Sequence, residues 1–243
     1  MNYAIVLAGG SGQRMKNSKL PKQFLNAYGK PIIIYTLEAF QKNDLIDAII
    51  IPCHKDWVDY LKDLTEHYRI TKAKYIVPGG KDRNGSILAG LDVIKNHLSE
   101  DDVVVIHDGV RPLIQQETIS KNVEVTREFG NAMTVRANVE TVVVTKEERA
   151  AWDDFKNRNY TYTLTAPQSF RAMELLSVLN EAEDLKDDDA MPLLDVSLMY
   201  ARLGKQIHLV VESGNNLKIT TPEDYFYLKS YLEMQESKDI LEV

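Results

Sequence analysis

The feature that most constrains this fold is a regular alternation of short β-prone runs with longer helical patterns. Apolar, β-branched runs predict strands at 3–8, 48–52, 74–77, 102–107, 132–135 and 206–211. Helical periodicity predicts helices at 31–41, 57–67, 84–96, 116–129, 172–182, 191–203 and 222–234. Strand–helix–strand units of this kind build a mainly parallel sheet with helices on both faces. We therefore expect an α/β chain forming a single Rossmann-like domain over residues 1–243.

The alternation breaks at residues 139–165. Two β-prone stretches, 141–145 and 160–165, flank a charged insert. We interpret them as an antiparallel excursion from the sheet, a protruding β-arm. Such an arm exposes apolar β surface that a second chain can cover. The sequence therefore predicts a homodimer with 139–165 as its dimerisation arm.

Composition excludes several classes of protein. No apolar run approaches the roughly 18 residues that span a membrane, and the N-terminus shows no signal-peptide pattern. A net charge of -7 without an extended basic face argues against nucleic acid as a partner. Cys53 is the single cysteine, so an intrachain disulfide is impossible and a reducing compartment is favoured. We expect a cytoplasmic protein with no membrane partner.

A glycine-rich turn follows the first predicted strand. Gly9, Gly10 and Gly12 lie there, and residues 1–37 carry five cations and no acid. Backbone N–H groups and cations of this kind can hold phosphate, although an ordinary turn with solvated cations has the same pattern. Met15 replaces the third glycine of the dinucleotide motif G-x-G-x-x-G, and no P-loop string occurs. A nucleotidyltransferase, with a nucleoside triphosphate over the loop, is a third possibility.

Polar residues also follow other predicted strands, at the edge where ligands gather in open α/β sheets. Asp108 is a natural ligand for Mg²⁺ bound to triphosphate, or else a turn residue. Arg111 could clamp a second phosphate or pair with an acid, and Lys218 could bind a ligand or be solvated. A glycine pair, Gly79-Gly80, opens the helix after the third strand. Their convergence on one edge favours a functional site.

Five motifs in register resemble the cytidylyltransferases that act on sugar and polyol phosphates. The resemblance spans nearly the whole chain. The motifs are Leu7-Ala8-Gly9-Gly10-x-Gly12-x-Arg14-Met15 with Pro21-Lys22-Gln23, Gly79-Gly80-x-x-Arg83-x-x-Ser86, His107-Asp108-x-x-Arg111-Pro112, Ala166-Pro167-Gln168-Ser169-Phe170, and Asn216-Leu217-Lys218-Ile219-Thr220.

Two branches of that family compete. One acts on methylerythritol phosphate in isoprenoid synthesis, and the other acts on ribitol 5-phosphate in teichoic acid and capsule synthesis. The strings Leu7-Ala8-Gly9-Gly10 and His54-Lys55-Asp56-Trp57 are similar to the ribitol branch. Two positions depart from it: Leu194-Asp195-Val196-Ser197 stands where Thr-Asp-Ala-Cys is common, and Ala166 stands where many relatives have threonine. The resemblance favours the ribitol branch and leaves the other open.

The resemblance implies in-line attack of a polyol phosphate on the α-phosphorus of CTP, with Mg²⁺ as cofactor and pyrophosphate as leaving group. It places Arg14 and Lys22 on the triphosphate, Lys218 on the α-phosphate and Asp108 at the metal. It places Arg111, Thr141 and Arg158 on the acceptor, with Arg158 reaching across the dimer. The nucleotide-binding residues that it implies are Leu7, Ala8, Gly9, Gly10, Gly12, Gly80, Lys81 and Ser86.

Three other functions fit part of the sequence. A dehydrogenase of the classical dinucleotide type is disfavoured by the missing third glycine. A nonenzymatic nucleotide-binding regulator would leave the acceptor-side cations without a purpose. A hexose-phosphate nucleotidyltransferase also begins its glycine loop with Leu-Ala-Gly-Gly, but the later motifs argue against it.

Overall fold

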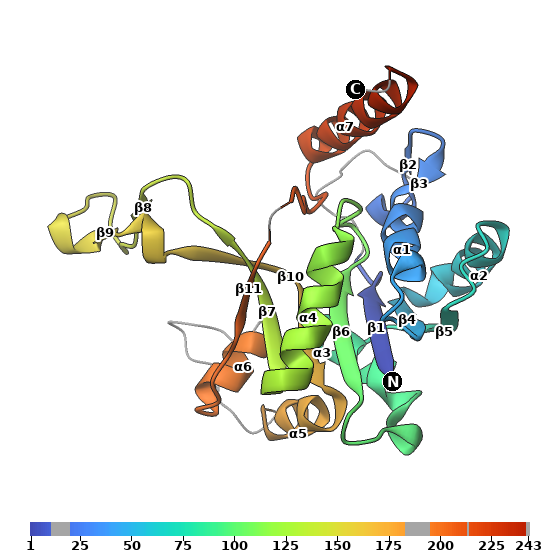
Figure 1. Cartoon of the computed structure of the whole chain (residues 1–243), viewed down its shortest axis with the longest axis horizontal. Helices are drawn as coiled ribbons and strands as arrows, with labels where there is room; N and C mark the ends of the chain where they lie inside the picture. Colours follow the sequence, from blue (N-terminus) through green and yellow to red (C-terminus); the bar gives the residue numbers. More distant parts are fainter. Residues whose placement is uncertain (11–19, 183–194, 213, 242–243) are drawn as a thin grey trace.

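The computed structural model describes residues 1–10, 20–182, 195–212 and 214–241. Its centre is a seven-stranded sheet with the order β11-β7-β10-β6-β1-β4-β5, shown in Figure 1. All neighbouring strands run parallel except β10, which is antiparallel to both β6 and β7. The strands are β1 (Asn2–Leu7), β4 (Ala48–Cys53), β5 (Ala73–Pro78), β6 (Val103–Asp108), β7 (Asn131–Ala137), β10 (Tyr162–Arg171) and β11 (Leu209–Val211).

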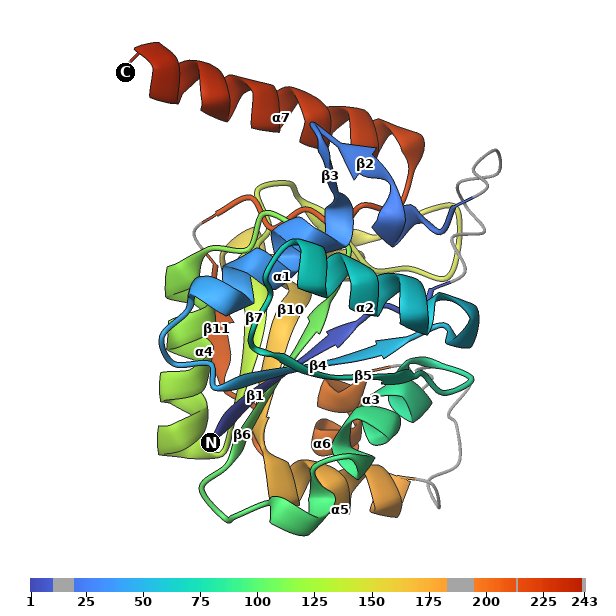
Figure 2. The ribbon, with the colours of Figure 1, turned by 90° about the vertical axis from the view of Figure 1, so that its right-hand side faces the viewer.

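Helices cover both faces of this sheet, as Figure 2 shows. One face carries α1 (Ile32–Lys42), α2 (Val58–His67) and α4 (Gln116–Phe129), and the other carries α3 (Arg83–Asp92), α5 (Ala172–Ala182) and α6 (Val196–Arg202). Alternate residues of β1 point to opposite faces. Ala4 and Val6 pack in the first layer, whereas Tyr3 and Ile5 pack in the second. The predicted mainly parallel α/β architecture is confirmed.

The main error of the sequence interpretation concerns β10. Residues 160–165 were expected to belong to the arm, but Tyr162 begins a strand that pairs with β7 and continues to Arg171 along β6. Pro167 lies inside this strand, where the pairing with β7 shifts register between Leu164 and Gln168. Proline lacks an N–H donor, so the sequence pattern argues against a central strand there.

The predicted arm is present in a different form. Its antiparallel ribbon pairs β8 (Val142–Val143) with β9 (Phe155–Lys156), so 141–145 does not pair with 160–165. Figure 1 shows this ribbon projecting far from the sheet. A second small ribbon, β2 (Asn26–Ala27) with β3 (Lys30–Pro31), lies beside the C-terminal helix α7 (Pro222–Leu241) in Figure 2.

Some predicted boundaries move because local capping decides them. The helix predicted at 84–96 ends at Asp92 and is followed by a 3₁₀ turn, Lys95–His97. The helix predicted at 191–203 begins at Val196, with Asp195 as its N-cap, and 191–194 lie outside the described residues. No helix among the described residues is long and apolar enough to cross a membrane.

Candidate functional site

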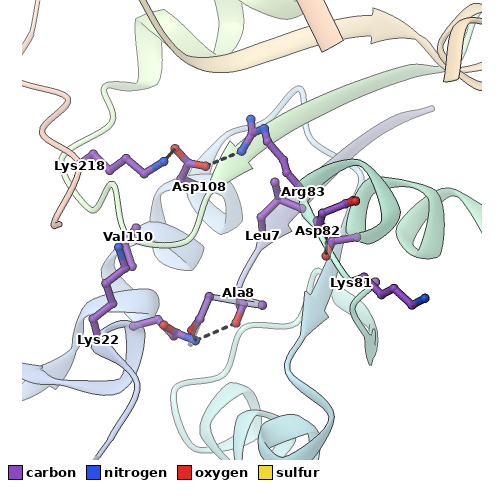
Figure 3. Close-up of a pocket in the computed structure, with 14 residues that line it drawn as sticks. Leu7, Ala8, Lys22, Lys81, Asp82, Arg83, Asp108, Val110 and Lys218 are labelled. Carbon is purple, nitrogen blue, oxygen red and sulfur yellow. Dashed lines mark hydrogen bonds and ion pairs between the residues drawn. The ribbon is translucent and has the colours of Figure 1, made fainter. Parts of the chain in front are cut away.

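The carboxyl ends of β1 and β6 lie side by side, because Leu7 is paired with Asp108 in the parallel ladder. The loops that follow these strands, together with the loop after β5, enclose a cavity of about 400 Å³, shown in Figure 3. The predicted ligand edge of the sheet therefore contains a pocket. Its lining residues are Leu7, Ala8, Gly9, Gly10, Lys22, Gln23, Gly80, Lys81, Asp82, Arg83, Ser86, Asp108, Val110 and Lys218.

The pocket gathers every described residue that was predicted to bind nucleotide. It also gathers Lys22 and Lys218 from the predicted catalytic set and Asp108, the predicted metal ligand. Gly12 and Arg14 lie outside the described residues. Segments up to about 200 residues apart in sequence thus meet in one place, as expected at the carboxyl edge of an open α/β sheet.

Gln23 fixes the glycine-rich turn and was given no role by the sequence interpretation. Its side-chain Nε2 donates to the carbonyls of Ala8 at 2.8 Å and Gly10 at 3.1 Å. Gln23 is buried, so these bonds are shielded from water. The signal was its position beside Lys22 in the Pro-Lys-Gln string. Gln23 therefore holds the backbone that lines one wall of the pocket.

The opposite wall depends on a close backbone approach at Gly80. A Cβ atom there would lie 2.3 Å from the backbone carbon of Gly85, so a side chain cannot be accommodated without movement. Asp82 caps α3 by accepting a hydrogen bond from Gly85 N at 2.7 Å. Ser86 Oγ donates to the Asp82 carbonyl at 2.8 Å. The Gly79-Gly80 motif therefore has a steric reason, and it places Lys81 and Ser86 at the pocket.

Asp108 is the electrostatic centre of the site. Its Oδ1 lies 2.7 Å from Arg83 Nη1, and its Oδ2 lies 2.9 Å from Arg111 Nε and 3.1 Å from Lys218 Nζ. Figure 3 shows Arg83 and Lys218 reaching Asp108 from opposite sides. Burial alone would raise the pKa of the Asp108 carboxyl, but the charges of Arg83, Lys218 and Arg111 outweigh burial and hold the pKa well below its ordinary value. Three cations thus converge on one ionised carboxylate.

The same geometry can be tested against the expected Mg²⁺. No group of three or more potential metal-binding side chains occurs in the described ranges. Among the described residues only Arg83 donates a hydrogen bond to Asp108 Oδ1, and a carboxylate oxygen can accept two. One carboxylate oxygen plus substrate phosphates and water is a usual environment for Mg²⁺. The site therefore fits a metal that arrives with a polyphosphate, and it offers no metal cage of its own.

The three predicted acceptor residues are placed differently. Arg111 is in the site: besides Asp108, it contacts the Asn216 carbonyl, with Nη1 donating at 2.8 Å. Thr141 and Arg158 belong to the arm and do not line the pocket. The exposed Arg158 donates from Nη1 to the carbonyl of Val139 at 3.1 Å. Within one chain none of these three residues lines the pocket, and Arg111 adjoins it through its ion pair with Asp108.

His107, beside Asp108, is fully buried and does not line the pocket. Its ring lies 5.2 Å from that of Phe40, and its Nε2 lies 3.2 Å from the Arg111 carbonyl oxygen. Burial, with only partial compensation by Asp108, lowers the pKa of His107 to about 4. The imidazole is therefore neutral near pH 7 and supports the turn that carries Arg111.

Arg83 is a second pocket residue that the sequence interpretation quoted but left without a role. It lines the pocket, pairs with Asp108, and places its Nε 4.0 Å from Asp195 Oδ2. It begins α3 directly after the Asp82 cap, so the glycine turn and the cap together aim it at the pocket. The signal was its place in the Gly79-Gly80-x-x-Arg83 motif.

Several known proteins are similar to this chain in sequence and in fold. Ribitol-5-phosphate cytidylyltransferases of Vibrio parahaemolyticus and Streptococcus agalactiae are 40% and 37% identical, covering 99% of this chain and 99% and 98% of theirs. A solved 4-diphosphocytidyl-2C-methyl-D-erythritol synthase of Anaerococcus prevotii has a TM-score of 0.80 at 27% identity, covering 96% of each chain. The family described as IspD, 2-C-methyl-D-erythritol 4-phosphate cytidylyltransferase, matches residues 2–234. The chain belongs to this cytidylyltransferase family.

Proposed function

We propose that the protein transfers a cytidylyl group from CTP to D-ribitol 5-phosphate, giving CDP-ribitol and pyrophosphate for teichoic acid or capsule synthesis. The observation that carries this proposal is the pocket that Lys22, Lys218 and Arg83 line, since their positive charges suit a triphosphate. The choice of acceptor is supported by full-length relatives at 34–40% identity that bear the name ribitol-5-phosphate cytidylyltransferase.

The chemistry needs little more than position and charge. The acceptor phosphate is ionised near neutral pH and attacks the α-phosphorus directly, so the protein need not supply a general base. The neutral, buried His107 agrees with this view. Lys22 and Lys218, together with Arg14, would stabilise the negative charge that builds on the α-phosphoryl group in the transition state.

Mg²⁺ would bind at Asp108 together with the triphosphate. When bound, the metal neutralises phosphate charge and polarises the phosphoryl oxygens. The support is the spare acceptor capacity of Asp108 Oδ1 on the pocket wall. The three cations at Asp108 oppose binding of a bare metal ion, because like charges repel in a partly buried site.

We also propose that the arm completes the acceptor site of a second chain in a homodimer. The arm exposes large side chains that a partner would cover, with Trp152 87% and Tyr160 83% exposed. Arg158 and Thr141 are exposed on the same arm and do not line the pocket of their own chain. A dimer in which each arm reaches the other chain's Arg111 side would give both residues a function.

The test is pyrophosphate release by the purified protein with CTP and Mg²⁺, comparing ribitol 5-phosphate with 2-C-methyl-D-erythritol 4-phosphate at equal concentrations. A strong preference for ribitol 5-phosphate is expected. The second candidate, methylerythritol phosphate, is favoured by the description of the matching family. A preference for it would refute the acceptor assignment, and no release with either acceptor would refute both.

A further inference from the structure

One short turn carries three neighbouring side chains to three different places. In the 3₁₀ turn Lys22–Phe24, Lys22 lines the pocket (Figure 3), and Gln23 holds the glycine-rich turn by its two hydrogen bonds. Phe24 is buried in the core. A turn of three residues has little regular structure of its own, and no side chain caps its beginning. The direction of Lys22 therefore depends on what holds Gln23 and Phe24.

Phe24 lies in a closed aromatic cluster with Trp57 and Tyr60. Its ring centroid is 5.2 Å from that of Trp57 and 5.3 Å from that of Tyr60, and the last two are 5.6 Å apart. Both contacts of Tyr60 are edge-on, which is a favourable arrangement of aromatic rings at this separation. Because each ring contacts both others, Phe24 is restrained by two partners.

Trp57 is attached to the strand that supports both walls of the pocket. Cys53 ends β4, bridges Ala8 on one side and accepts a hydrogen bond from Gly79 N at 2.7 Å on the other. The segment His54-Lys55-Asp56-Trp57 follows directly, and its last residue donates its backbone N–H to the carbonyl of its first at 2.9 Å. The sequence singles out this segment, yet none of its residues lines the pocket. Trp57 therefore contacts Phe24 from a base that is tied to the pocket walls.

We propose that Trp57 is a positioning residue for Lys22. Its indole ring packs on Phe24, and Phe24 anchors the turn from which Lys22 reaches the pocket. A shift of about 1 Å in a group that acts on the transition state can cost a large factor in rate. Removal of the indole ring should therefore lower turnover, although this ring does not line the pocket. The inference rests on the proposed function, because that function places Lys22 on the triphosphate.

Packing in the core alone leads to a different expectation. Trp57 is half-buried against the hydrophobic layer that contains Phe24. If Trp57 served stability alone, its replacement would lower the free energy of unfolding but leave the kcat of the folded protein unchanged. Kinetic and unfolding measurements on the same variants therefore separate the two roles.

The test is a double-mutant cycle on kcat for pyrophosphate release at saturating substrates, with Lys22→Ala, Trp57→Leu and the double variant. Trp57→Leu should lower kcat about tenfold and leave KM for CTP within about threefold of the wild-type value. In the Lys22→Ala background the same change should lower kcat less than about twofold, because the group that Trp57 positions is absent. Trp57→Phe keeps a ring for Phe24 and should lose about threefold or less.

Tyr68→Leu is the matched control. Tyr68 packs against the same hydrophobic layer as Trp57, and its ring contacts that of His67. This variant should keep the wild-type kcat even where its unfolding free energy is lower. Tyr60→Leu changes a position that is 39% exposed, so it tests the aromatic cluster with less risk to folding. It should lower kcat about threefold, through the loss of its contacts with Phe24 and Trp57.

A folded Trp57→Leu protein with wild-type kcat would overturn the inference, and so would an equal loss from Trp57→Leu in the wild-type and Lys22→Ala backgrounds. No pyrophosphate release by the wild-type protein with either ribitol 5-phosphate or methylerythritol phosphate would instead refute the proposed function. The four proteins of the cycle would then be compared in their affinity for CTP. Additive effects of the two changes on that affinity would overturn the role of Trp57, and non-additive effects would support it.

Discussion

Replacing His107 with glutamine should flatten the pH dependence of stability between pH 7 and pH 5. Burial lowers the pKa of His107 to about 4 in the folded protein, against about 6.5 for an ordinary histidine. Between these values the unfolded chain binds a proton that the folded protein rejects, so stability falls as pH drops through 6.5 toward 4. Integration over this interval gives a loss of about 2 kcal/mol from pH 7 to pH 5 in the wild-type protein.

The measurement is urea unfolding at pH 7 and pH 5, with the change in unfolding free energy compared between proteins. His107→Gln will be less stable at both pH values, since it loses the packing against Phe40. The contribution of His107 to the fall in unfolding free energy between pH 7 and pH 5 should disappear in this variant. His97→Gln, at an exposed site, should retain the wild-type loss. Asp102 and Asp108 have lowered pKa values and stay ionised at pH 5, so they add little in this window. An undiminished loss in His107→Gln would refute the reasoning.

Three further substitutions test the site. Lys22→Ala should lower kcat by about 100-fold or more through lost transition-state charge, while Lys62→Ala, on the surface of α2, should keep wild-type kinetics in the same pyrophosphate assay. Arg158→Ala should raise KM for the polyol phosphate and leave KM for CTP nearly unchanged. Arg149→Ala, on the same arm, should change neither KM. An equal rise in both KM values in Arg158→Ala would contradict the assignment. Gly80→Ala should destabilise the fold by about 1–3 kcal/mol, seen as a lower Tm, because the new Cβ meets the Gly85 backbone.

Local patterns in the sequence were sufficient to predict most of the sheet. The apolar runs that form β1, β4 and β6 are fully or nearly buried along their length, and periodicity identifies such strands well. β10 was only partly recognised, because Pro167 argues against a central strand and its pairing depends on β6 and β7, which are distant in sequence. The arm was located except at its C-terminal end, where 162–165 belong to β10, and its pairing could not be predicted, since two β-prone stretches do not specify register.

The candidate site likewise has some features that the sequence could predict and others that it could not. The pocket positions of residues with a motif of their own, such as Lys22, Asp108 and Lys218, could be predicted because each lies at or after the end of a strand at the expected edge. The roles of Gln23 and Arg83 could not, because they depend on contacts that only the folded chain creates. Arg83 is placed by its ion pairs with Asp108 and Asp195. Asp195 lies 112 positions after Arg83 in the sequence but close to it in the fold. Hydrophobic periodicity in a sequence does not predict ion pairs between residues that are far apart in the chain.

The charge balance around Asp108 suits the proposed binding of two anionic substrates in one pocket. A single buried carboxylate holds Arg83, Arg111 and Lys218 in place before any ligand arrives, so the cations need little reorganisation when phosphates bind. Asp108 and Asp195 together place two negative charges beside these three positive ones, and the remaining positive charge would attract polyphosphate. In the proposed function Arg111 would meet the acceptor and Lys218 the nucleotide, so the same carboxylate would position cations for both substrates. Asp108 therefore acts as an organising counter-ion whether or not it also binds a metal.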